Sequence, residues 1–241
     1  MRHGSHSNVV TATLAITHGG EAFHLLPEKA IWWPATHTLI VADLHLGKAA
    51  AFRHRGIPLP HGTTHATLTR LSCLIARYSP HNLLILGDLF HAQAGRTNEV
   101  EAQLQQWRAM HPLHITLVRG NHDRRAGDPL PALDITCECE PWLSRGFTFL
   151  HDPACNTTAA ALAGHIHPVT SHRDRDGTRM RLPCFALIAN TLILPAFGTF
   201  TGGWNMKPQH ADDRIFAIAG DDAVIELPSY NSASSRLIRR Y

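Results

Sequence analysis

Carboxylate, amide and imidazole side chains recur along this 241-residue chain at the ends of apolar runs that are typical of buried strands. Such donors without a thiolate suit manganese, iron or zinc better than magnesium or calcium. There are enough of them for two metal sites that share a bridging carboxylate. Asp88 is the candidate bridge, because the preceding Gly87 has no side chain to shield its carboxylate from two cations. The predicted ligands are Asp43, His45, Asp88, Asn121, His151, His165 and His167.

Two divalent ions roughly 3.5–4 Å apart can activate water and clamp a phosphate for in-line attack. No side-chain nucleophile is then required. His122 follows the predicted ligand Asn121, and we expect it to donate a proton to the leaving alkoxide, with Asp123 orienting its ring. The alternative is that His122 is a structural residue bonded to Asp123.

Several further residues near these motifs are candidates to contact a substrate. Lys48 and Arg53 follow the first motif closely, and they could hold non-reacting phosphates or neutralise the transition state. A solvated surface position is the alternative for both. His91 follows Asp88 and could line the site, or lie behind the ligands with its own partners satisfied. Trp204, in a glycine-rich segment, could stack a base, or pack in the core or between two copies of the chain.

Strand and helix patterns alternate in the first half of the chain, which predicts parallel pairing with right-handed crossovers. Ligands collect beyond the carboxyl ends of such strands, so the first polar groups of the series should meet at one edge. If the extended backbone persists past the strand, Asp43 and His45 point the same way. Residues 11–26 are predicted to form a hairpin around Gly19-Gly20, and Thr63 or Thr64 to cap the first helix. The predicted strands are 38–42, 82–86 and 113–118, and the predicted helices are 61–78 and 97–110.

The second half of the chain predicts a different, mostly antiparallel sheet. Residues 147–150 form a strand that ends at His151, and 156–163 form a short helix or turn. Two strands are expected in 184–194 and two more in 214–225. The sequence therefore predicts one α/β domain over residues 11–230, with two packed sheets flanked by helices. We expect a disordered lead-in at 1–10 and a loose tail at 231–241.

The composition limits the classes of function. Lys and Arg exceed Asp and Glu by 22 − 19 = +3 charges, which permits a polyanionic substrate but is far from the balance of a protein that coats nucleic acid. Five cysteines without C-x-x-C spacing argue against a disulfide framework and a structural zinc site, and favour a reducing, cytoplasmic location. No apolar run approaches the roughly 18 residues of a membrane span. The first residues have no apolar signal core.

The ordered series of motifs resembles the calcineurin-like metallophosphoesterase superfamily. These motifs are Asp43-Leu44-His45, Gly87-Asp88, Gly120-Asn121-His122-Asp123, His151 and Gly164-His165-Ile166-His167. Longer matches at 43–48, 119–123, 164–168 and 194–203 resemble the bacterial DNA-ligase-associated metallophosphoesterases. Those proteins are encoded beside an ATP-dependent DNA ligase, a helicase and an exonuclease. One departure is His151-Asp152, where many relatives in the wider superfamily have His-Gly.

The resemblance implies a four-layer metallophosphoesterase sandwich of two mixed sheets flanked by helices. It also implies a manganese-dependent phosphodiesterase that cuts single-stranded DNA as an endonuclease in nucleic acid repair, with the ligase, helicase and exonuclease as functional partners. Iron and zinc are the alternatives to manganese. One implied metal site takes Asp43, His45, Asp88 and His167, and the other takes Asp88, Asn121, His151 and His165.

Two other functions fit the same residues. The first is hydrolysis of a small phosphoester, such as a cyclic nucleotide or a nucleotide pyrophosphate, at the same metals. The second is a non-catalytic scaffold that keeps the fold without the chemistry, against which the intact ligand series argues.

Overall fold

The computed structural model describes residues 12–155, 158–173, 176–220 and 222–228. The predicted lead-in at 1–10 and tail at 231–241 lie outside these residues, as does the first residue of the predicted hairpin, Thr11. The domain boundaries therefore stay a prediction.

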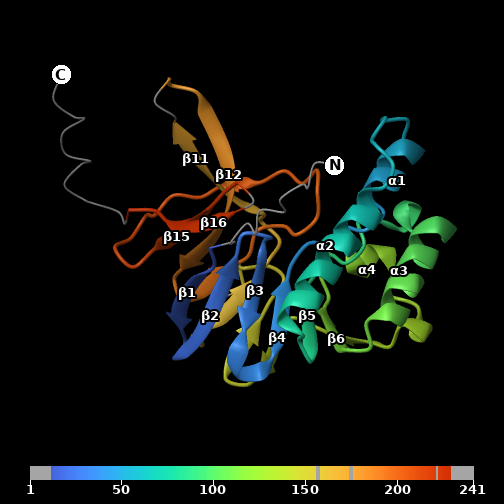
Figure 1. Cartoon of the computed structure of the whole chain (residues 1–241), viewed down its shortest axis with the longest axis horizontal. Coiled ribbons are helices and arrows are strands. Elements are labelled where there is room, and N and C mark those ends of the chain that lie inside the picture. The colour runs from blue at the N-terminus through green and yellow to red at the C-terminus, as the bar shows by residue number, and fades with distance from the viewer. Residues whose placement is uncertain (1–11, 156–157, 174–175, 221, 229–241) are drawn as a thin grey trace, which may run out of the picture.

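Seven strands form the first sheet, in the order of the sequence (Figure 1). The first four strands pair antiparallel, and the last four, starting with β4, pair parallel. The predicted hairpin around Gly19-Gly20 and the three parallel strands are confirmed, whereas β3 and β7 were not predicted. The strands are β1 (Leu14–His18), β2 (Glu21–Leu26), β3 (Ala30–Trp33), β4 (Thr38–Val41), β5 (Asn82–Leu86), β6 (His114–Val118) and β7 (Ile135–Glu138).

The helices pack on the face of the first sheet that points away from the second sheet, as Figure 1 shows. They are α1 (Lys48–His54), α2 (Thr63–Tyr78), α3 (Asn98–Met110) and α4 (Asp123–Ala126), with short 3-10 turns at Pro34–Thr36, Gln93–Gly95 and Pro131–Leu133. The predicted cap of α2 is wrong, because Gly62 occupies that position in a left-handed conformation. The hydroxyl of Thr64 instead accepts a hydrogen bond from the backbone N–H of Gly47 at 3.1 Å, which ties α2 to the start of α1.

Nine strands form the second sheet, which is mixed. Its antiparallel pairs outnumber its parallel ones, as predicted, but β10 pairs parallel with both of its neighbours, β9 and β13. The prediction of a helix or turn is wrong at Ala161–Ala163, which is strand β10, while 156 and 157 lie outside the described residues. The strands are β8 (Trp142–Ser144), β9 (Phe147–Phe149), β10, β11 (Pro168–Arg173), β12 (Arg179–Ile188), β13 (Thr191–Ile193), β14 (Trp204–Asn205), β15 (Arg214–Ala219) and β16 (Ala223–Glu226).

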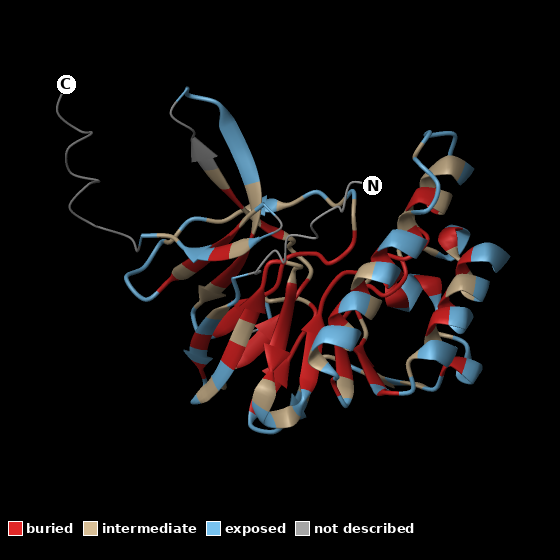
Figure 2. Ribbon diagram, viewed as in Figure 1, coloured by how far each residue is buried: buried red, intermediate tan, exposed pale blue. Residues whose placement is uncertain are grey.

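Aromatic side chains hold the two sheets together. Phe23 of β2 meets Phe147 of β9 edge-to-face, with 5.5 Å between the ring centroids, and Trp33 packs on the same ring. Figure 2 shows the strands of this interior as buried, while the helices expose their outer faces. The predicted α/β sandwich of two mixed sheets with helices is confirmed. Helices occur among the described residues only between 34 and 133, and Met206 and Leu227 pack on the outer face of the second sheet.

All five cysteines are free thiols. None of the helices in the described part of the chain combines the length and apolar character needed to cross a bilayer.

Candidate metal centre

Loops from both sheets meet at the carboxyl ends of β4, β5 and β6, and backbone hydrogen bonds tie them together. The N–H of Asp43 donates to the carbonyl of Gly87 at 3.1 Å, and the N–H of His45 donates to the carbonyl of Asp88 at 2.8 Å. From the second sheet, the N–H of Gly198 donates to the carbonyl of Asp43 at 2.9 Å. The predicted convergence at this edge is confirmed, and the loop after β13 contributes to it.

Most of the predicted ligands have a left-handed backbone, which is uncommon for residues other than glycine. The φ angles are 54° at Asp43, 49° at His45, 53° at Asp88, 71° at His165 and 48° at His167. The extended backbone of β4 therefore does not persist through Asp43 and His45, so the condition for their shared direction is not met. Strain of this kind costs of order 1–3 kcal/mol per residue and clusters at functional sites. These five residues supply donor atoms to two adjoining groups, one with Asp43, His45 and His167 and the other with Asp88 and His165.

Glycines leave the space that the polar side chains fill. A Cβ on Gly87 would lie 2.1 Å from Nδ1 of His151, and a Cβ on Gly120 would lie 2.2 Å from Oδ1 of Asp88. A Cβ on Gly164 would lie 2.8 Å from Oδ2 of Asp43. The glycines of the motifs are thus required by close approach between loops.

The residues of the first implied metal set lie together. The Nε2 atoms of His45 and His167 are 3.2 Å apart, and Nε2 of His167 lies 3.4 Å from Oδ1 of Asp43. Nε2 of His45 is 3.9 Å from Oδ2 of Asp88. These donor atoms face one point, which is the arrangement that a shared cation requires.

The residues of the second set meet on the other side of Asp88. Nε2 of His151 lies 2.9 Å from Oδ1 of Asn121 and 3.0 Å from Nδ1 of His165. The same nitrogen is 3.5 Å from Oδ1 of Asp88, whose other oxygen faces the first set. The two oxygens of this one carboxylate therefore face two different groups of donors, as expected of a bridge.

The electrostatics of the cluster fit two cations. Oδ1 of Asp43 is buried without a hydrogen-bond partner in the protein, which is costly unless a cation or water compensates it. Burial, and next the negative charge of Asp43, raise the pKa of Asp88 to about 8. Burial lowers the pKa of His45 and of His151, so their imidazoles are neutral at pH 7. A pair of divalent ions would stabilise the ionised form of Asp88 and would be bound by the neutral imidazoles.

His122 and His91 form a stacked pair beside the first set. The ring centroids are 4.9 Å apart at an interplanar angle of 25°. Nδ1 of His122 donates to the backbone carbonyl of His91, and its Nε2 lies 3.9 Å from Oδ2 of Asp88. The hydrogen bond fixes Nδ1 as the protonated nitrogen, so Nε2 faces the cluster. His91 thus orients His122 with both its carbonyl and its ring, and its own Nδ1 is buried without a partner in the protein.

Asp123 does not orient His122. Its carboxylate is buried and accepts backbone N–H groups from Asp88 at 2.7 Å, Gly120 at 2.9 Å and Phe90 at 3.3 Å. The expected contact between Asp123 and the ring of His122 is therefore wrong, because three amide donors occupy its oxygens. Asp123 instead ties the loop after β6 to the loop after β5.

The two predicted basic residues differ in position. Lys48 lines a small hollow together with His45, and the nearby charges of Asp43 and Asp88 partly offset the fall that burial causes in its pKa. Arg53 donates to the carbonyls of Leu59 and Pro60, both at 3.2 Å. The structure brings Lys48 to the cluster. It holds the side chain of Arg53, in the last turn of α1, against the loop that follows the helix.

Glu140 is a positioning residue that the sequence did not indicate. Its Oε2 accepts the N–H groups of His151 at 2.8 Å and Asp152 at 2.9 Å, and its Oε1 pairs with Arg124 at 2.5 Å. Burial opposes ionisation of this carboxyl, but these hydrogen bonds lower its pKa overall. Glu140 fixes the start of the loop that carries His151. It lies outside every motif, so no spacing could have identified it.

Comparisons with known proteins show the family of the chain. The family model for calcineurin-like phosphoesterases matches residues 36–190. The crystal structure of Pseudomonas putida nuclease MPE is 42% identical, with a TM-score of 0.78 over 89% of this chain and 100% of that chain. Yfce, a phosphoesterase from E. coli, is 16% identical, with a TM-score of 0.39 over 80% of this chain and 99% of that chain. The comparison with curated proteins finds no match. The chain belongs to the calcineurin-like phosphoesterases and is a metal-dependent phosphoesterase.

Proposed function

We propose that this protein is a binuclear phosphodiesterase that cuts single-stranded DNA internally, with manganese as its metal. The observation that carries the proposal is the convergence of six further donor residues around the two oxygens of Asp88, with the imidazole of His122 beside them. The similarity to a nuclease from Pseudomonas putida supports a nucleic acid as the substrate. The motifs of the present chain also resemble those of repair enzymes that are encoded with a ligase, a helicase and an exonuclease. We therefore propose that it acts in DNA repair, with these three enzymes as functional partners.

The proposed ligand sets divide the cluster at Asp88. Asp43, His45 and His167 would hold one ion with one carboxylate oxygen, and Asn121, His151 and His165 would hold the other ion with the second oxygen. Two such ions supply a nucleophile from water at neutral pH and neutralise charge on the phosphate. Mixed carboxylate, amide and imidazole donors suit Mn²⁺.

His122 would supply the proton for the leaving group. Its Nδ1 proton is held by the carbonyl of His91, so a proton for transfer sits on Nε2 only when the ring is an imidazolium. That ring donates from Nε2 to the departing 3′ or 5′ oxygen as the P–O bond breaks, and it is left as the neutral Nδ1–H tautomer. Lys48, beside His45, would contact a non-bridging phosphate oxygen.

The test offers the manganese-loaded enzyme three substrates: a circular single-stranded DNA, an aryl phosphodiester and an aryl phosphomonoester. We expect the circle to be linearised and the diester to be hydrolysed in preference to the monoester. The circle has no ends, so its cleavage requires endonuclease activity. Turnover of the small esters with an intact circle would contradict the proposal and indicate a small-molecule phosphoesterase instead.

A further inference from the structure

Two aromatic side chains are exposed beside the candidate metal centre. Eight large hydrophobic residues are exposed in the described part of the chain, and only Phe200 and Trp204 among them are aromatic, at 56% and 69% exposure. They are four residues apart in the segment that follows β13. Phe200 lines a pocket with His167, and the backbone of Trp204 is hydrogen-bonded to the carbonyl of His167, so both residues lie near the candidate metal centre.

The backbone of Trp204 is fixed to the loop that carries the predicted ligands His165 and His167. Its N–H donates to the carbonyls of Ile166 at 3.1 Å and His167 at 3.2 Å. Trp204 begins β14, where it stands opposite Pro168 of β11. The exposed indole is therefore carried by a segment that hydrogen bonds hold in place. The strand partner of Trp204, Pro168, directly follows the predicted ligand His167. Rigid aromatics lose little entropy when a partner stacks on them.

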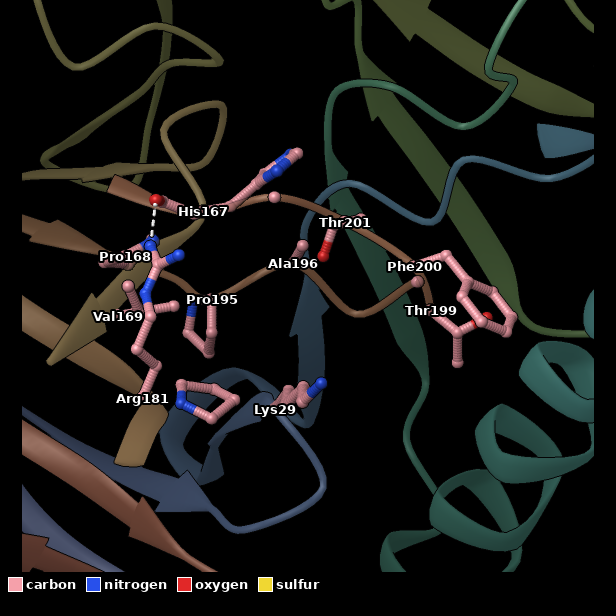
Figure 3. A pocket seen from close by; sticks show the side chains of 14 residues that line it. Lys29, His167, Pro168, Val169, Arg181, Pro195, Ala196, Thr199, Phe200 and Thr201 are labelled. Atoms are coloured by element: carbon pink, nitrogen blue, oxygen red, sulfur yellow. Dashed lines mark hydrogen bonds between the residues drawn. The ribbon is translucent and has the colours of Figure 1, made fainter. Parts of the chain in front are cut away.

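Phe200 lines two hollows that each include a residue of the first metal set. One is a pocket of about 350 Å³ whose wall includes His167, and the other is a small hollow that includes His45 and Lys48. Figure 3 shows Phe200 at one end of the larger pocket and Arg181 at the other. The φ of Phe200 is 56°, which is unusual for a bulky residue and holds the ring out of the core.

Cationic groups line the same pocket as Phe200. Arg181 of β12 lines the same pocket, and its Nη2 donates to the carbonyl of Gly203 at 2.6 Å, directly before Trp204. No carboxylate in the described part of the chain forms an ion pair with Arg181. Lys29 lines the pocket as well (Figure 3). The pocket therefore combines the aromatic face of Phe200 with positive charge, and Trp204 follows its last lining residue, Gly203. Aromatic rings together with positive charge are the combination that proteins use for single strands.

We propose that Phe200 and Trp204 form a stacking platform for unpaired bases of the strand whose phosphate occupies the metal centre, with Arg181 contacting its backbone. This inference rests on the proposed function, and it adds a base-binding site to the proposed metal centre. A duplex keeps its bases stacked on one another, so the platform favours single-stranded over double-stranded substrate. Because stacking accepts any base, it provides affinity with little sequence preference.

The test measures binding and catalysis separately. Binding of a labelled oligo(dT) to manganese-loaded His122→Ala protein, in which cleavage is slowed, is followed by fluorescence anisotropy. Phe200→Ala and Trp204→Ala are each added to this parent, with Leu143→Ala on the distant strand β8 as the matched control. We expect each aromatic change to weaken binding by on the order of 5- to 100-fold, and Leu143→Ala to leave it unchanged. A strand with abasic sites should bind the parent as weakly as oligo(dT) binds the variants.

Bound manganese per chain, measured by elemental analysis on the same single variants in the wild-type background, shows whether the metal centre is intact. We expect the metal content of the wild type, and we expect Trp204→Phe to restore DNA binding. Equal affinity for oligo(dT) in the parent and both aromatic variants would overturn the platform, while cleavage of the DNA circle would leave the proposed function standing. If the His122→Ala parent does not bind oligo(dT) and the wild-type enzyme leaves the DNA circle intact, both the platform and the proposed function are overturned. A change of oligomeric state on Trp204→Ala, without a change in DNA affinity, would overturn the platform in favour of contact between two copies.

Discussion

The imidazole of His122 should matter for phosphodiesters with an alkoxide leaving group and much less for phosphodiesters with a nitrophenolate leaving group. Its Nδ1 is committed to the carbonyl of His91, and its Nε2 faces the shared carboxylate of Asp88. The alkoxide of a sugar is a poor leaving group and needs a proton as it departs. A nitrophenolate leaves without one. The role of His122 therefore depends on the leaving group, which a purely structural residue would not show.

The first prediction concerns His122→Ala. Cleavage of single-stranded DNA should fall by about 10²- to 10⁴-fold, which is the usual contribution of a general acid. Hydrolysis of bis-nitrophenyl phosphate should change far less, because its leaving group needs no proton. Steady-state rates on both substrates give the comparison. Equal losses on the two substrates would show that His122 acts through the structure of the site and not by proton transfer.

The second prediction concerns metal binding and pH. The pKa of Asp88 is raised to about 8 because the carboxyl is buried near Asp43, and the carboxyl must ionise to bind a cation. Below that pKa a proton competes with the metal, so the apparent affinity for Mn²⁺ should rise with pH between about 6 and 8. The imidazoles of His45 and His151 add little competition in this range, because burial lowers their pKa. Titration calorimetry in two buffers of different ionisation enthalpy should detect the released proton. Affinity that does not change with pH would contradict this account.

At the scale of elements, the loops after the strands carry the site, and their geometry was only partly predictable. The polar residue types and their positions after apolar runs indicated Asp43, Asp88 and Asn121 because parallel strands end at one edge. The left-handed backbone at Asp43 and His45 could not be predicted, since it is imposed by hydrogen bonds to the neighbouring loop. Only those tertiary contacts hold it in place.

Strand β10 illustrates a second limit of prediction at this scale. Ala161–Ala163 consists of residues with low strand propensity, and alanine favours helix when no other interaction decides. The segment is a strand because it lies fully buried between β9 and β13, with parallel pairing on both sides. Tertiary packing overrides propensity in such a position. Without β10, the loop of His165 and His167 would have no fixed start.

The third prediction tests the close approach of the loops. In Gly120→Ala, the new Cβ would lie 2.2 Å from Oδ1 and 2.7 Å from the backbone nitrogen of Asp88, and a backbone atom cannot move aside alone. We expect loss of the second metal ion and of hydrolysis, measured by elemental analysis and by rates. Gly146→Ala, with a positive φ but open space around it, is the control. It should cost about 1 kcal/mol of stability and keep both metal and activity. A Gly120→Ala protein with full metal content would contradict the argument.

At the scale of the whole molecule, the sandwich brings residues from both sheets to one point. Asp43, Asp88 and Asn121 follow strands of the first sheet, whereas the predicted histidine ligands after β9 and β10 follow strands of the second. The two sheets could be predicted because the apolar patterns of their strands are visible in the sequence. The gathering of the metal-ligand candidates could be predicted because each follows such a strand pattern. The sequence could not predict Glu140 or the orientation of His122 by His91, because those contacts depend on how the loops pack.

The central claim is that one carboxylate joins two metal ions into a single hydrolytic site. Metal-stripped wild-type and Asp88→Asn proteins should be titrated with Mn²⁺, with the bound ions per chain and the cleavage of circular single-stranded DNA measured on the same samples. We predict two ions and cleavage for the wild type. For Asp88→Asn we predict at most one ion and a rate at least about 10²-fold lower, since metal ions contribute several kcal/mol to the transition state. An Asp88→Asn protein that binds two ions and cuts the circle at the wild-type rate would contradict the account.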